Sequence, residues 1–244
     1  MQYLSTRDSA LRVSAQEAIV RGLAPQSGLF VPETFPQADL DAWKNLSYPE
    51  LAEKVLAGFL TDYSADFLHT ATASTYGAAF GGKAGETVKV RDGLYSLELW
   101  HGPTCAFKDF GAGFMGRMTG LLGAADEKLV ILTATSGDTG SAVAHGFYNV
   151  PGVEVVLLYP EGKISRLQEC QMTALGGNIH PLRVGGTFDD CQRLVKELFA
   201  DAKFRAGHRV SSANSINLLR WIPQAFYYFY GYCQWRQATG GDRP

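Results

Sequence analysis

Residues 128–212 alternate between short apolar runs and amphipathic segments, and this alternation constrains the fold most. The run from Lys128 to Thr135 is continuous and rich in β-branched residues, which is typical of a buried parallel strand. Further strands are predicted at 153–159, 178–184 and 208–212, and helices at about 139–148, 164–175 and 187–203. Strands joined through helices by short connections predict an α/β fold, a parallel sheet with helices on both faces.

The residues on either side of this region divide the chain into two expected parts. Residues 1–80 are expected to form a small N-terminal domain of loops and amphipathic helices, with capping boxes at 14–17 and 47–50. Residues 81–244 are expected to form the α/β domain, which also contains β-rich stretches at 87–90 and 94–100 and a helix at 107–122. The aromatic run at 226–235 predicts a buried helix within 215–237.

Charge and composition exclude several classes of protein. Among 244 residues, 22 basic and 24 acidic side chains leave a net charge of −2, which favours neither a nucleic-acid footprint nor a polybasic membrane patch. No apolar run reaches the length of a signal peptide or a membrane span, and the four cysteines are scattered without CxxC spacing. We therefore expect a cytoplasmic protein that binds neither nucleic acid nor membrane.

Three segments carry residue types suited to chemistry. They are His101–Gly111, Thr133–Ser141 and Ser211–Arg220, and each follows a predicted strand and opens a helix. Open α/β sheets bind ligands at the carboxyl ends of their strands, so three such segments predict one shared crevice.

Lys108 is the candidate nucleophile in the first segment. A lysine near the start of a helix is usually a solvated surface residue, but Phe107 and Phe110 flank this one and small residues follow it. An apolar wall favours the free amine, which is the form that attacks an aldehyde to make a Schiff base.

The second segment, TSGDTGS, has two interpretations. Small residues at the start of a helix let backbone N–H groups converge on a carboxylate or phosphate. Alternatively, Ser136, Asp138 or Thr139 simply caps the helix. The segment matches neither a Walker loop nor a dinucleotide fingerprint.

The third segment offers two amides and a guanidinium. Asn214, Asn217 and Arg220 are spaced to lie close to one helical face, where they would form a phosphate clamp, and the alternative is an Asn cap with a surface arginine. His101 is interpreted as a hydrogen-bonded turn residue and Cys105 as a packing residue. His145, His180 and His208 show no metal-ligand spacing, so no metal is expected.

These segments resemble the threonine synthase family. HGPTCAFKDFG is similar to that family's lysine segment, TSGDTGS to its substrate-carboxylate loop and SANSINLLR to its Asn/Arg segment. The similarity extends through YLSTRD, GLAPQSGLFVPE, LYPEGKIS, QMTALGGNIH and GTFDDCQ, and so covers nearly the whole chain.

The resemblance implies a fold type II enzyme dependent on pyridoxal 5′-phosphate (PLP), which converts O-phospho-L-homoserine and water into L-threonine and phosphate. It implies that Lys108 binds PLP and acts as acid and base, and that Asp138 lies near the cofactor ring. It is compatible with assembly into a homo-oligomer. It further implies that the substrate is bound by seven residues, Thr135, Ser136, Gly137, Asp138, Thr139, Asn214 and Arg220.

One departure from the family limits these implications. The family's Gly-Asn loop for the PLP phosphate and its polar residue at the pyridine nitrogen do not occur before Pro244, so we expect a fragment. We expect the 244-residue chain alone to bind PLP weakly and to form no threonine. A PLP-dependent serine or threonine dehydratase and a non-catalytic module are the alternatives, and the pair of Asn214 and Arg220 favours threonine synthase over a dehydratase.

Overall fold

A four-stranded parallel sheet is the centre of the α/β part. The computed structural model describes residues 1–123 and 128–242. The strands lie in the order β8-β7-β6-β9, and their bounds are β6 (Leu129–Ala134), β7 (Val153–Pro160), β8 (Ile179–Val184) and β9 (Arg209–Ser212). The predicted parallel sheet is therefore confirmed, and each predicted strand lies within one residue of its observed bounds.

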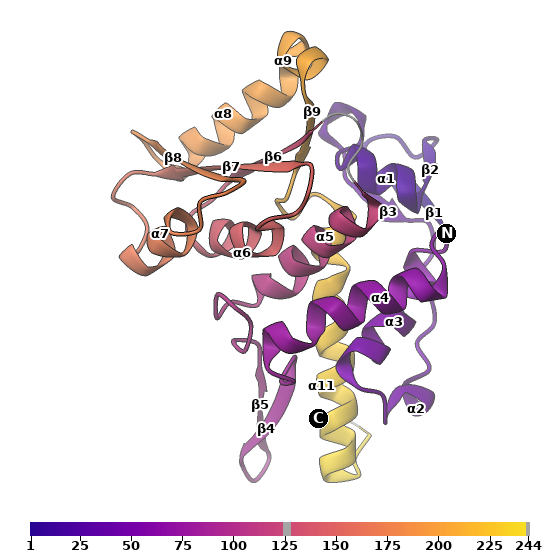
Figure 1. Cartoon of the computed structure of the whole chain (residues 1–244). Coiled ribbons are helices and arrows are strands. Elements are labelled where there is room, and N and C mark those ends of the chain that lie inside the picture. Colours follow the sequence, from indigo (N-terminus) through magenta and orange to yellow (C-terminus); the bar gives the residue numbers. More distant parts are fainter. Residues whose placement is uncertain (124–127, 243–244) are drawn as a thin grey trace.

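Helices cover both faces of this sheet (Figure 1). On one face lies α8 (Phe188–Ala200), which packs Cys191 and Val195 against the buried side chains of β6 and β7. On the other face lie α6 (Asp138–Phe147) and α7 (Arg166–Thr173). The single helix predicted at 187–203 is wrong, because Asp201 leaves the helical conformation and caps a separate helix, α9 (Ala202–Gly207).

Beneath α6 runs α5 (Lys108–Leu122), the helix that begins at Lys108. The two helices approach closely because glycines meet at their contact: a Cβ added at Gly116 would collide with the carbonyl oxygen of Gly146. This packing sets the position of α5 relative to the sheet.

The N-terminal part contains a small sheet that the sequence did not predict. Three antiparallel strands, β1 (Gln2–Ser5), β2 (Arg12–Ser14) and β3 (Phe30–Pro32), pair in the order β2-β1-β3. Strands of three or four residues are too short to display a period of two, which is why loops were expected there. The remaining elements are α1 (Ala15–Arg21), η1 (Pro25–Ser27), α2 (Leu40–Trp43), α3 (Tyr48–Phe59), α4 (Ala65–Tyr76) and η2 (Ala78–Phe80).

Of the two predicted capping boxes, one is complete. Ser47 and Glu50 cap α3 reciprocally. Ser14 accepts a hydrogen bond from the N–H of Glu17, but the Glu17 carboxylate pairs with Arg21 at 2.6 Å, so this second box is half formed.

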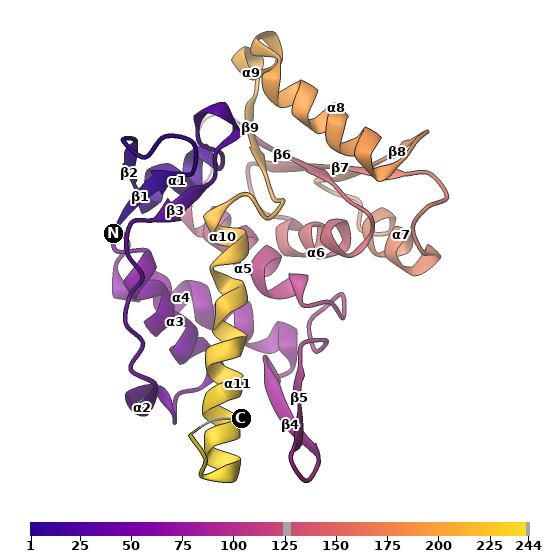
Figure 2. The same cartoon turned by 180° about the vertical axis from the view of Figure 1, so that it is seen from behind.

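An antiparallel hairpin, β4 (Glu86–Arg91) and β5 (Leu94–Glu98), stands apart from the main sheet. Beside it runs α11 (Pro223–Thr239), which follows the short α10 (Leu218–Trp221) and carries the aromatic run (Figure 2). The aromatic run forms a helix, as predicted, but only one face of it is buried: the ring of Tyr227 meets that of Phe110 on α5 at 5.3 Å. Tyr228 faces outward and is 67% exposed.

The N-terminal helices and α5 share one hydrophobic core. Phe110 lies between Phe80 and Tyr48, with ring centroids 4.7 and 5.5 Å away, and all three rings belong to the same buried cluster. The first turn of α5 is thus held from both sides. Within residues 1–123 and 128–242, no helix is both long and apolar enough to cross a membrane.

Candidate active site

The loop that leads into α5 is fixed by Asp109. Its carboxylate accepts hydrogen bonds from the Thr104 N–H at 2.9 Å and the Thr104 hydroxyl at 2.5 Å, and its side chain is buried. Burial raises the pKa of Asp109, while the bonds from Thr104 oppose that change by stabilising the carboxylate. The backbone immediately before Lys108 is therefore held by a contact within its own segment.

Lys108 itself faces the start of α6. Its Nζ lies 3.8 Å from Oδ2 of Asp138 and 4.3 Å from the ring centroid of Phe107, and its side chain is 24% exposed. The amine is thus partly covered, reachable from solvent and directed at the second of the three segments.

The loop after β6 presents backbone N–H donors at the start of α6. The hydroxyl of Thr135 is buried and accepts hydrogen bonds from the N–H groups of Gly137 and Gly140, at 3.0 and 2.7 Å, so Thr135 shapes the loop. The N-cap of α6 is Gly137, and the side chain that caps the helix is that of Thr135, through the N–H of Gly140, rather than that of Ser136, Asp138 or Thr139, so the predicted capping residues are wrong. No described residue accepts a hydrogen bond from the N–H of Ser136, Asp138 or Thr139. This arrangement suits an anion.

Gly137 adopts a conformation that only glycine tolerates. Its φ is 135° and its ψ is −88°, and an added Cβ would lie 2.5 Å from the side chain of Gln168. Gln168, at the start of α7, donates from Nε2 to Oδ1 of Asp138 at 2.5 Å. Sequence reasoning missed Gln168, because its capping-box spacing after Ser165 gives no sign of a contact with residue 138.

We expect Gly137→Ala to destabilise the protein by about 2 kcal/mol, because it combines backbone strain with a collision against Gln168. Urea unfolding would measure the change. Gly162→Ala is the matched control, since Gly162 has φ +65° but no atom near its added Cβ, and should cost about 1 kcal/mol. Equal costs for the two substitutions would contradict the collision.

The third segment meets the second at the sheet. The Asn214 side-chain amide donates to the carbonyl of Ala134, the last residue of β6, at 3.1 Å. The connection from β6 passes through α6 on one face of the sheet, whereas β9 is reached through α8 on the other. The loops after β6 and β9 therefore leave the sheet at its topological switch point, where open α/β sheets bind ligands.

Asn214, Asn217 and Arg220 do not share a helical face, which corrects the sequence prediction. The helix begins only at Leu218, because Asn217 is its N-cap and accepts from the N–H of Leu219 at 3.0 Å. The Asn217 amide donates to Ile19 of the N-terminal part, so this side chain joins two regions of the protein.

Arg220 is fully buried, with a side-chain exposure of 0%. Its Nε donates to the carbonyl of Ala213 at 2.7 Å and its Nη1 to the carbonyl of Lys108 at 3.2 Å. Burial lowers the pKa of Arg220 to about 10, and the nearby Asp109 carboxylate opposes this. The guanidinium is thus charged at neutral pH and ties the backbone of Lys108 to the end of β9. Its role in phosphate binding stays a prediction.

Cys105 was expected to pack, and this is wrong. The residue is exposed and has a φ of 57°, within a turn in which its N–H donates to the carbonyl of Gly102. The left-handed turn directs the side chain away from the core.

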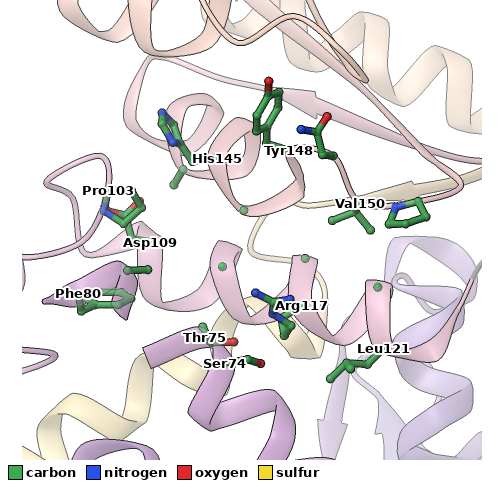
Figure 3. A pocket seen from close by; sticks show the side chains of 18 residues that line it. Ser74, Thr75, Phe80, Pro103, Asp109, Arg117, Leu121, His145, Tyr148 and Val150 are labelled. Carbon is green, nitrogen blue, oxygen red and sulfur yellow. The ribbon is translucent and has the colours of Figure 1, made fainter. Parts of the chain in front are cut away.

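A cavity of about 370 Å³ lies between α5, α6 and the C-terminal end of α4 (Figure 3). Asp109, Arg117 and His145 line it, whereas Lys108 and residues 135–139 do not. Burial lowers the pKa of His145, which favours its neutral imidazole. We therefore treat this cavity as separate from the candidate active site.

Comparisons with known proteins agree with this geometry. The family model described as "Threonine synthase N terminus" matches residues 2–76, and the model described as "Pyridoxal-phosphate dependent enzyme" matches residues 84–227, more than half of the chain. The chain belongs to the pyridoxal-phosphate-dependent enzyme family. The family match places Lys108, Asp138 and Asn214 inside the matched region.

Individual members of this family are similar over almost the whole chain. Threonine synthase of Serratia marcescens is 42% identical over 98% of this chain and 55% of its own length. The crystal structure of threonine synthase from Escherichia coli matches with a TM-score of 0.85 and 40% identity over 96% of this chain and 54% of that one. The PLP-bound threonine synthase from Brucella melitensis matches with a TM-score of 0.88 and 35% identity over 100% and 53%. The chain spans about half the length of the curated relatives it matches.

The described residues fit the cofactor of this family. A partly exposed primary amine at the start of a helix, beside a carboxylate and a loop with free N–H donors, provides a covalent attachment point with polar contacts around it. Lys108 and Asp138 are the residues that would hold PLP.

Proposed function

We propose that these residues belong to a threonine synthase, which converts O-phospho-L-homoserine and water into L-threonine and phosphate. The observation that carries the proposal is the approach of Lys108 Nζ to Asp138 at the switch point of the sheet, within a chain 42% identical to a threonine synthase. We also propose the division into a small N-terminal domain, 1–80, and the first part of the α/β domain, 81–244.

The proposed roles follow from the donors and acceptors present. PLP, when bound, withdraws electrons from the substrate and so eases the loss of protons from Cα and Cβ and of phosphate from Cγ. Lys108 would bind the cofactor and, as a free amine, would accept and return protons. The free N–H groups of Ser136, Asp138 and Thr139 would bind the substrate carboxylate, and Thr135 and Gly137 would shape that loop.

The substrate phosphate is assigned to the segment after β9. Asn214 lies at the carboxyl end of β9 with its side chain only partly buried, and it would contact the phosphate there. Arg220 would contribute positive charge from its buried position, and it would hold the backbone of Lys108 in place. The phosphate departs as an anion, so positive charge nearby would stabilise it as it leaves.

Product analysis tests the proposal. The whole natural polypeptide, supplied with PLP and O-phospho-L-homoserine, should form L-threonine and phosphate in equal amounts. The same protein should not convert L-serine into ammonia and a keto acid. Ammonia from serine, with no phosphate from O-phospho-L-homoserine, would instead establish the dehydratase.

A further inference from the structure

Two carboxylates meet on one face of the β4–β5 hairpin. Glu86 and Glu98 are direct partners in the antiparallel register, so their side chains lie on the same side of the hairpin. Like charges in directly opposite positions destabilise a strand pair unless a positive group neutralises them. The hairpin therefore needs a cationic partner at this end.

His101 completes the group from the start of the loop that leads to Lys108. Its Nε2 lies 2.6 Å from Oε2 of Glu98 and 3.7 Å from Oε2 of Glu86. One ligand atom from each of the three residues lies within 4.8 Å of the others. The side chains of Glu98 and His101 are 19% and 20% exposed and that of Glu86 is 36% exposed, so the group is largely covered but reachable from solvent.

Among the described residues, Lys83 also pairs with one of these carboxylates. Its Nζ lies 3.4 Å from Oε2 of Glu86, and its side chain is 57% exposed. A long, solvated lysine can swing away at little cost, since exposed ion pairs contribute little. It therefore leaves the space between the two carboxylates and His101 available.

We propose that Glu86, Glu98 and His101 bind a divalent transition metal of the zinc type. Imidazole nitrogen and carboxylate oxygen are the donors that zinc takes, at about 2.0–2.2 Å. The two carboxylates balance the charge of the ion, and three protein ligands leave further positions to water. On binding, the ion replaces the hydrogen bond between Glu98 and His101, and the three donor atoms move slightly apart to make room for it.

The bound ion fastens the end of the hairpin to the loop that carries Lys108. His101 is in that loop, whereas Glu86 and Glu98 come from the two strands. The site is independent of the proposed reaction, because it includes none of the residues assigned to PLP or substrate. Sequence spacing gave no sign of it, since Glu86 reaches the other two only through strand pairing.

Metal titration tests the proposal. The purified protein, stripped with a chelator, is titrated with Co²⁺ while its visible d–d absorption is followed, and Zn²⁺ is then added in competition. We expect one equivalent to bind, and His101→Asn and Glu98→Gln each to weaken binding at least tenfold. Glu86→Gln is a third variant, at the most exposed ligand, should either of the others fail to fold.

His180→Asn is the matched control. Its Nε2 lies 2.7 Å from Oε2 of Glu154, so it reproduces the histidine–glutamate pair without a second carboxylate. Binding should be unchanged in this variant. Two results would overturn the proposal: no saturable binding, which would leave His101 as a hydrogen-bonding partner of Glu98 alone, or binding that survives the changes at His101, Glu98 and Glu86.

Discussion

Replacing Lys108 by alanine should abolish covalent attachment of PLP while leaving the fold intact. The Lys108 amine makes a 3.8 Å ion pair with Asp138 and a contact with the ring of Phe107, whereas the carbonyl that Arg220 binds remains in the variant. Turnover should fall by at least about 10²–10⁴-fold, the contribution of one acid and base group. The melting temperature should not change appreciably.

Borohydride reduction followed by peptide mass analysis measures the attachment directly. The native protein, with PLP, should carry the cofactor on the peptide that contains Lys108, and the variant should carry none. Lys128→Ala is the control, because this exposed lysine lies at the opposite end of β6 and pairs with Glu154. Labelling of a different lysine in the native protein would show that the assignment of Lys108 is wrong.

Replacing Arg220 by alanine should cost about 3–5 kcal/mol of folding free energy, because it removes the donor to the buried carbonyl of Ala213, removes the contact with the partly buried carbonyl of Lys108 and empties a packed space. For a domain of this size the melting temperature should fall on the order of 10 °C. Arg220→Lys should be intermediate, since a single ammonium cannot reproduce the forked contacts to Ala213 and Lys108.

Arg117→Ala provides the comparison on an exposed arginine of α5, and it should change stability by less than about 0.5 kcal/mol. Thermal unfolding and binding of inorganic phosphate should be measured together on these variants. A loss of phosphate binding in Arg220→Ala with an unchanged melting temperature would contradict the positioning role and leave Arg220 as a phosphate ligand alone.

Local patterns predicted the elements that depend on near neighbours in the chain. The apolar run at 129–134 forms the central strand, and the capping box at Ser47 forms as expected, because both depend on residues within a few positions. The patterns failed for strands too short to show a period and for a long helical segment that is broken in the structure. The three-residue strands β2 and β3 are below the length at which alternation is visible, and the break at Asp201 divides what looked like one helix.

The sequence by itself determined the parallel sheet, the family resemblance and the importance of Lys108, because side-chain type and spacing encode these directly. Only the tertiary structure decided what surrounds Lys108. Arg220 contacts Lys108 although 112 positions separate them in the chain, and Gln168 contacts Asp138 across a separation of 30 positions. Contacts over such separations arise from how α5, α6, α7 and β9 pack together. No local pattern could therefore have shown that Arg220, expected on a helical face as part of a phosphate clamp, is buried and bonded to the backbone of Lys108.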